Sequence, residues 1–249
     1  MDRPVVDSPV ALVVGAGSGI GAATAARLSQ DGFTVIAAGR RKQPVTDVAR
    51  DIERSGGSAI AVQLDAAEPG SVNDAVSEIT RALGHIEVLA HCAGVNAPPV
   101  GIEEMTDEDW TSVLRTNLDG SFFVARAVAR VMIPARTGAM IFIASDRALY
   151  GAKRRPHYAA SKAGQIALMR SLALELGPFG ITANVINPGT TDTKMAREHI
   201  TEHDLAATIA RDPLGRISQP EEIAELVAFL AGPGRFMTGQ LVTTRVRTG

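Results

Sequence analysis

The chain has 249 residues, a formal net charge of −2 and 45% hydrophobic residues. The near-neutral charge gives no reason to expect nucleic acid or a membrane as a partner, and the length suits one α/β domain over 1–249. The single cysteine, Cys92, excludes an internal disulfide framework and a cysteine metal cluster, and no apolar run approaches the ~18 residues of a membrane span. Because Asp7 and Pro9 interrupt the region where a signal peptide has its apolar core, we expect a cytoplasmic protein.

Short β-rich runs alternate with longer helical patterns from one end of the chain to the other. The predicted strands are 11–14, 34–38, 59–64, 86–90, 139–144, 182–187 and 240–244. Most are apolar on both faces, as expected for a parallel sheet that is covered on both sides. Segments of helix length lie between them, among them 19–30, 69–83, 108–134, 157–176 and 219–231. Repeated strand–helix–strand order predicts a doubly wound, seven-stranded parallel sheet in a three-layer α/β/α arrangement.

A glycine-rich loop, GAGSGIG, follows the first predicted strand and opens the first predicted helix. Glycine lets the backbone approach a pyrophosphate closely, and a helix N-terminus offers N–H groups to the anion. An ordinary glycine-rich turn is the alternative, but the position between a strand and a helix favours a dinucleotide-binding loop. The predicted contacts from this loop are Gly15, Gly17, Ser18, Gly19 and Ile20.

The spacing Gly15-x-x-x-Gly19-x-Gly21 resembles the glycine motif of the short-chain dehydrogenase/reductase family, which has a Rossmann-type fold. The family also carries a serine, a tyrosine and a lysine, in a Y-x-x-x-K pattern with the serine upstream. In the family the serine usually stands thirteen residues before the tyrosine. Ser145 and Tyr158 match that spacing, and Lys162 completes the Y-x-x-x-K pattern.

Three further motifs extend the resemblance over about residues 9–240. The segment RTNLDGSFFVARA resembles the context of the family's active-site asparagine and supplies Asn117. The pattern P-G-x-x-x-T is matched by Pro188, Gly189 and Thr193, and the segment from Pro213 to Gln240 is similar to the family's C-terminal part.

The resemblance implies hydride transfer between a nicotinamide and a carbonyl or secondary alcohol, with Tyr158 as the acid/base. A free phenol has a pKa of about 10, and a cation within ~4–6 Å lowers such a pKa by about 1–3 units. Lys162, one helical turn away, would lower the pKa of Tyr158 and bind the nicotinamide ribose. Ser145 would polarise the substrate oxygen, and Asn117 would hold a water in a proton relay to Lys162.

The end of the second predicted strand indicates which nicotinamide cofactor is used. Gly39 stands at the usual acidic position, and Arg40 and Arg41 follow it. No carboxylate would repel a 2′-phosphate there, and a guanidinium can bind one bidentately, so we expect NADP(H). The alternative is that the arginines are solvated loop charges, in which case NAD(H) would also serve.

Other predicted cofactor contacts follow from the same resemblance. Asp65, which ends the third strand pattern, resembles the family acid at the adenine ring, although a helix N-cap is an equally good interpretation. The remaining predicted contacts are Ala66, Ala93, Gly94, Tyr158, Lys162, Pro188, Gly189, Thr191 and Thr193.

Two segments depart from the family pattern. His91 and Cys92 precede Ala93-Gly94 where the family commonly has two asparagines, and we interpret His91 as a satisfied core residue, with no metal site. The C-terminal sequence TTRVRTG replaces a common Val-Asp-Gly-Gly, so Arg245 and Arg247 leave the pocket rim and the assembly open.

The substrate-facing segments suggest an anion without identifying it. The sequence between Ser145 and Tyr158 contains Arg147, Lys153, Arg154 and Arg155, which either recognise a carboxylate or form a solvated basic loop; Tyr150 either packs on the substrate or closes a turn. The variable region at about 190–215, with 194–212 at its centre, is the expected substrate lid. Its His199 and His203 have i, i+4 spacing, but a solvated helix face is favoured over a metal site.

Two other functions remain as alternatives to an NADP(H)-dependent oxidoreductase. One is an NAD-dependent dihydrodiol dehydrogenase of dihydro-dihydroxybenzoate type, which the short segment PGTTDTKM resembles. The other is a catalytically silent nucleotide-binding protein, which the complete Asn117, Ser145, Tyr158 and Lys162 set disfavours. In the family the helices that correspond to 108–134 and 157–176 make subunit contacts, so we expect a homodimer or homotetramer.

Overall fold

The computed structural model describes residues 8–198 and 200–245. Seven parallel strands form one sheet with the order β3-β2-β1-β4-β5-β6-β7. The strands are β1 (Val10–Val14), β2 (Thr34–Gly39), β3 (Ser58–Gln63), β4 (Val88–His91), β5 (Gly138–Ile143), β6 (Ile181–Asn187) and β7 (Leu241–Thr243). The predicted doubly wound fold is therefore confirmed, and each strand lies within two residues of its predicted ends.

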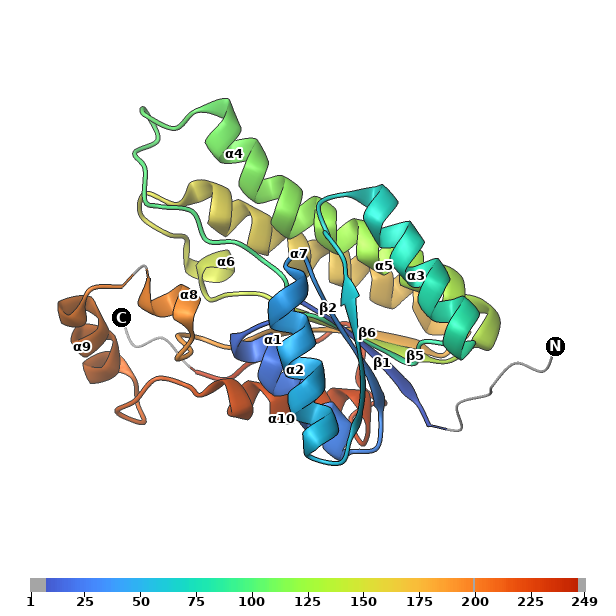
Figure 1. The fold of residues 1–249 in the computed structure, drawn as a ribbon. Helices are drawn as coiled ribbons and strands as arrows, with labels where there is room; N and C mark the ends of the chain where they lie inside the picture. The colour runs from blue at the N-terminus through green and yellow to red at the C-terminus, as the bar shows by residue number, and fades with distance from the viewer. Residues whose placement is uncertain (1–7, 199, 246–249) are drawn as a thin grey trace.

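Helices cover both faces of the sheet and give the three layers (Figure 1). One face is covered by α3 (Pro69–Leu83), α4 (Asp107–Leu114), α5 (Gly120–Ala135) and α7 (Pro156–Leu176). The other face is covered by α1 (Gly19–Gln30), α2 (Lys42–Arg54) and α10 (Pro220–Ala231). The shorter helices are α6 (Arg147–Tyr150), the 3₁₀ turn Gly177–Phe179, α8 (Lys194–Arg197) and α9 (Glu202–Arg211).

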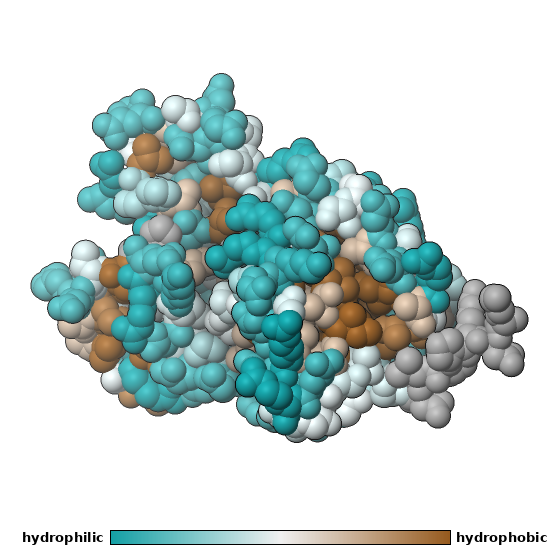
Figure 2. All heavy atoms as spheres, in the orientation of Figure 1, coloured by the Kyte–Doolittle hydropathy of each residue, from teal (hydrophilic) through white to brown (hydrophobic). Residues whose placement is uncertain are grey.

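Alternation along the central strands divides the core between the two faces. Leu12 and Val14 of β1 pack in the cluster under α3, α5 and α7, whereas Ala11 and Val13 pack in the cluster under α1, α2 and α10. All four side chains are at most 1% exposed, as expected for a parallel strand buried on both faces. β3 differs because it is an edge strand, and its Ile60 is 42% exposed. Figure 2 shows hydrophobic residues gathered beside this edge and hydrophilic residues over the outer face of α2.

The helix predicted over 108–134 is interrupted. A five-residue π-helical segment, Arg115–Asp119, separates α4 from α5 without a break in the chain's helical path. A π turn widens the helix locally and is often found at functional sites. Here it contains Asn117, whose side chain is fully buried.

The strand order reverses between β1 and β4, since β1 leads to β2 on one side and its other neighbour is β4. In open α/β sheets, ligands bind at such a switch point beyond the carboxyl ends of the strands. Among the described residues, no helix has the length and apolarity needed to cross a bilayer.

Candidate active site

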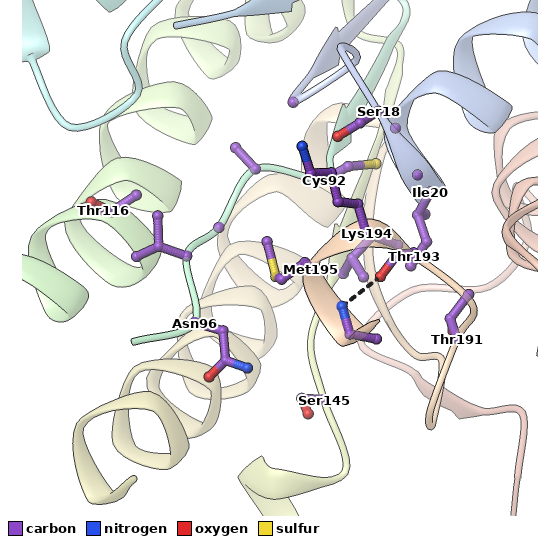
Figure 3. A pocket seen from close by; sticks show the side chains of 18 of the residues that line it. Ser18, Ile20, Cys92, Asn96, Thr116, Ser145, Thr191, Thr193, Lys194 and Met195 are labelled. Carbon is purple, nitrogen blue, oxygen red and sulfur yellow. Dashed lines mark hydrogen bonds between the residues drawn. The ribbon is translucent and has the colours of Figure 1, made fainter. Parts of the chain in front are cut away.

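A cavity of about 430 Å³ lies at the carboxyl ends of the strands. Figure 3 shows side chains from several strand ends around it: Ser18 and Ile20 after β1, Cys92 after β4, Ser145 after β5, and Thr191 and Thr193 after β6. Every residue predicted to contact the cofactor lines this one cavity: Gly15, Gly17, Ser18, Gly19, Ile20, Arg40, Arg41, Asp65, Ala66, Ala93, Gly94, Tyr158, Lys162, Pro188, Gly189, Thr191 and Thr193. Ser145 also lines it, whereas Asn117 lies behind the wall.

The glycine loop can approach a ligand closely because it has no side chains at Gly15 and Gly21, where the protein leaves no space for a Cβ. A Cβ on Gly15, whose φ is +88°, would lie 2.6 Å from the nitrogen of Ala93, and one on Gly21 would overlap the carbonyl oxygen of Gly15. α1 begins within this loop, at Gly19, and the Ser18 side chain does not cap it, so its first N–H groups remain available to an anion. These residues fit the pyrophosphate of a dinucleotide.

Two arginines line the cavity at the end of β2. Arg40 and Arg41 are exposed, and within residues 8–198 and 200–245 neither is paired with a carboxylate. Gly39 contributes no side chain, so the residues here fit a 2′-phosphate better than a bare ribose hydroxyl. Asp65 is not the cap of α3, which is Glu68; instead its Oδ1 accepts a 3.0 Å hydrogen bond from the Ala67 nitrogen.

Tyr158 and Ser145 face each other across the cavity wall. Burial raises the pKa of the Tyr158 phenol, while a hydrogen bond with the Ser145 side chain and the charges of Arg147 and Arg155 act in the opposite direction. The Ser145 hydroxyl donates to Asp146 Oδ1 at 3.2 Å and accepts from the Arg147 nitrogen at 3.3 Å. A neutral phenol beside a serine hydroxyl can donate a proton to a substrate oxygen held between them.

Lys162 is buried, with 5% of its surface exposed, and burial lowers its pKa to about 8. Its Nζ donates to the Ile143 carbonyl and to Gln165 Oε1, each at 2.9 Å. An ammonium with this pKa loses its charge before the Tyr158 phenol ionises. The sequence-based expectation that Lys162 lowers the pKa of Tyr158 is therefore not reproduced, because desolvation is the larger effect on both groups.

Asn117 holds the loop after β4 against the helix that carries Lys162. Its Oδ1 accepts from the Val95 nitrogen at 2.8 Å, and its Nδ2 donates to the Val95 carbonyl and to Ser161 Oγ, each at 3.0 Å. Its main-chain carbonyl accepts a 2.6 Å hydrogen bond from Ser121 Oγ. The water relay that the resemblance implies for Asn117 stays a prediction.

His91 is a core residue but is not satisfied as expected, whereas Cys92 is half-buried and lines the cavity. Neither ring nitrogen of His91 has a hydrogen-bond partner among the described residues. Burial lowers the pKa of His91 to about 3 and raises that of Cys92 to about 12, so both side chains are neutral. The described part of the chain contains no cluster of three His, Cys, Asp or Glu residues that could hold a metal ion.

The structure separates the four cations of the segment before α7. Arg147 and Arg155 line the cavity, and Arg155 is half-buried without a paired carboxylate among the described residues. Lys153 and Arg154 are exposed outside it, and Arg154 lies 3.4 Å from Glu104. Tyr150, at the end of α6, is 56% exposed and does not line the cavity.

The region expected to form a lid contains α8 and α9. Thr193 caps α8 by accepting from the Ala196 nitrogen at 3.1 Å (Figure 3), and Met195 and Ile200 line the cavity. The side chain of Arg245 lies 3.4 Å from Asp212, just after α9, and 3.7 Å from Glu222 of α10. His203 lies on α9, while His199 and Arg247 lie outside the described residues.

Sequence reasoning missed Ser121 and Gln165. Gln165 Nε2 donates to Ser121 Oγ at 2.6 Å, and both side chains are buried. The available signal was a glutamine within the mostly apolar run AGQIALM, where a helix face that packs on the sheet is normally apolar.

Comparisons with known proteins identify the family of this chain. The family model described as Enoyl-(Acyl carrier protein) reductase matches residues 15–244. The chain is 33% identical over 238 residues to a 3-oxoacyl-[acyl-carrier-protein] reductase of Thermotoga maritima, covering 95% of this chain and 96% of that protein. It is 35% identical over 242 residues to an L-rhamnose 1-dehydrogenase (NAD(P)(+)) of Azotobacter vinelandii, covering 94% of each.

A solved structure gives the same result. The crystal structure of gox2181 superposes with a TM-score of 0.92 at 34% identity, covering 96% of this chain and 95% of that one. With the glycine loop and the Ser145, Tyr158 and Lys162 side chains at one cavity, these matches show that the chain belongs to the short-chain dehydrogenase/reductase family of oxidoreductases, whose members use NAD(P)(H).

Proposed function

We propose that the protein is an NADP(H)-dependent oxidoreductase that interconverts a secondary alcohol and a ketone. One observation carries this proposal: Ser145, Tyr158 and Lys162 line the same cavity as the glycine loop that opens α1. A proton donor, a hydrogen-bond donor for the substrate oxygen and an anion-binding backbone are thereby brought together.

When bound, the nicotinamide supplies or accepts the hydride. The hydroxyl of Ser145 holds the substrate oxygen, and the neutral phenol of Tyr158 gives that oxygen a proton during reduction. Lys162 uses two of its three N–H groups on Ile143 and Gln165, which leaves one for the nicotinamide ribose at the cavity. Val95, fixed by Asn117, closes the wall behind them.

NADP(H) is the proposed cofactor because Arg40 and Arg41 line the cavity as unpaired cations within the described chain, with no side chain at Gly39 to oppose a phosphate. The proposed substrate is a small carbonyl compound with an anionic group, because half-buried Arg155 lines the same cavity beside Tyr158. The region 190–215 is the proposed lid, and α4, α5 and α7 supply the proposed contacts of a homodimer or homotetramer. We place all of these functions in a single domain.

The experiment that tests the reaction is Tyr158→Phe, which removes the proton donor and leaves the ring. The rate of NADPH-dependent reduction is measured on a panel of carbonyl compounds as the decrease in nicotinamide absorbance. We expect this rate to fall by at least about a thousandfold, in line with the loss of a general acid. NADPH binding, measured by fluorescence, should be unchanged within about twofold. Full turnover in this variant would refute the assignment of Tyr158.

A further inference from the structure

A chain of buried hydrogen bonds connects Lys162 to the main chain at Asn117. Lys162 Nζ donates to Gln165 Oε1 at 2.9 Å, Gln165 Nε2 donates to Ser121 Oγ at 2.6 Å, and Ser121 Oγ donates to the Asn117 carbonyl at 2.6 Å. Gln165 and Ser121 are at most 1% exposed. In the reaction described above Gln165 enters only as a hydrogen-bond partner of Lys162, and Ser121 is not used.

The donor and acceptor roles in this chain can be arranged in only one way. An ammonium has only donors, so the glutamine must present its oxygen to Lys162 and its NH₂ group to Ser121. Ser121 then accepts with a lone pair and directs its single proton to the Asn117 carbonyl. Flipping the amide would place its NH₂ group against the ammonium, so the network holds Gln165 in one orientation, and aligned hydrogen bonds of this kind strengthen one another.

Among residues 8–198 and 200–245, no carboxylate is paired with the ammonium of Lys162. Cys92, directly after β4, is the titratable group that acts on the charge of Lys162, and that charge contributes to lowering the pKa of His91; Tyr158 lies one turn earlier on α7. The pKa of His91 is lowered to about 3, and those of Cys92 and Tyr158 are raised, so all three are neutral near pH 7. The partners of the charge are therefore neutral oxygens from Ile143 and Gln165.

We propose that Gln165, oriented by Ser121, is a positioning residue that holds the charged side chain of Lys162 at the cavity wall. The amide oxygen accepts a hydrogen bond from the ammonium but does not titrate, so this anchor is the same across the working pH range. It also fixes which N–H group of Lys162 remains for the cavity. The structural statement stands on the contacts alone, and its kinetic consequence rests on the proposed oxidoreductase function.

The first test measures Lys162 directly. The chain has four lysines, and the other three, Lys42, Lys153 and Lys194, are exposed, so ¹⁵N-labelled lysine gives one buried signal whose pH titration can be followed by NMR. Gln165→Met keeps the shape and removes the acceptor, which should lower the pKa of Lys162 by about one unit or more. Gln165→Glu places an anion beside the ammonium and should raise that pKa.

Ser121→Ala is the second variant, and it removes only the hydroxyl that orients Gln165. Without the serine to orient Gln165, the pKa of Lys162 should fall by less than in Gln165→Met, and the double variant should match Gln165→Met. Ser171→Ala is the matched control, because Ser171 makes the same kind of bond to the carbonyl four residues earlier but is exposed. It should leave the Lys162 titration unchanged.

The kinetic test uses the pH profile of carbonyl reduction. The alkaline limb of kcat should move to lower pH in Gln165→Met, with kcat at pH 8 about tenfold lower, and to higher pH in Gln165→Glu, while NADPH affinity changes less than kcat. An unchanged Lys162 titration in Gln165→Met, or shifts of the same sign in both Gln165 variants, would overturn the proposal. If Tyr158→Phe shows that the oxidoreductase assignment is wrong, the NMR result still decides the role of Gln165.

Discussion

Replacing Lys162 by methionine should stabilise the protein at neutral pH and stabilise it less at alkaline pH, although it removes a group that the proposed reaction needs. Burial lowers the pKa of Lys162 from 10.5 to about 8. A difference of roughly 2.5 pKa units at about 1.4 kcal/mol each corresponds to about 3 kcal/mol. The buried charge lowers the stability of the native state by this amount, because the ammonium is poorly hydrated there.

The sign follows from where each state binds its proton. Below pH 8 the native and unfolded chains are both protonated at Lys162, and the cost is fully present. Between pH 8 and 10.5 the native state has released the proton and the unfolded chain still holds it, so the stability of the wild type rises with pH. Relative to Lys162→Met, the free energy of unfolding of the wild type should increase by about 1 kcal/mol from pH 7 to pH 9. The increase should reach about 3 kcal/mol once the pH exceeds 10.5, the pKa of Lys162 in the unfolded chain.

The assay is equilibrium unfolding in guanidinium chloride, followed by circular dichroism at pH 7, 8 and 9, at one protein concentration for both proteins. Subtracting the two pH profiles cancels the contributions of groups that Lys162 does not influence. Cys92 is coupled to Lys162, but burial raises its pKa to about 12, so the native thiol stays neutral from pH 7 to 9 in both proteins. The carbonyl of Ile143 and the amide of Gln165 lose a donor in the variant, which offsets part of its gain at a single pH but leaves the slope unaffected. Parallel pH profiles for the two proteins would refute the buried-charge reasoning.

Three further substitutions test other parts of the cavity. Arg40→Ala should raise the KM for NADPH about tenfold and leave that for NADH unchanged in steady-state kinetics; equal changes for both would contradict a 2′-phosphate contact. Arg155→Ala should raise the KM for a carboxylate-bearing ketone about tenfold but not that for its methyl ester. Equal changes in KM for the acid and the ester would contradict an anion site at Arg155. Gly21→Ala should lower nucleotide affinity and destabilise the protein by about 1–3 kcal/mol, because its Cβ meets the backbone of Gly15. Gly70→Ala, where a Cβ meets nothing within 4 Å, should do neither, and equal Tm values for the two glycine variants would rule out the steric argument.

The cavity lining could be predicted from the sequence because parallel strands present their carboxyl ends at one edge. A motif that follows a recognisable strand therefore has a known place, as Gly15 after β1 and Ser145 just beyond β5 do. The helix through Asn117 was predicted as regular, because its apolar pattern continues on both sides of the π segment. A single widened turn does not change that pattern enough to be seen in one sequence.

Contacts between distant helices could not be predicted. Ser121 and Gln165 are 44 positions apart, and nothing in either helix indicates that the two side chains meet. The four cations before α7 could not be ranked either. Arg154 adopts a left-handed φ of +59°, which sequence does not predict for arginine, and the structure shows Arg155 lining the cavity while Arg154 does not.

The π segment also determines how this part of the chain tolerates changes in length. A π turn holds about one residue more than an α turn, so deleting Thr116 would let α4 run into α5 as an ordinary helix, with the outer parts of both helices still facing their present neighbours. The same deletion inside α5 would rotate the rest of that helix by about 100° and turn its buried face toward water. A homologue that lacks one residue in Arg115–Asp119 would therefore keep the fold but lose the π turn that contains Asn117.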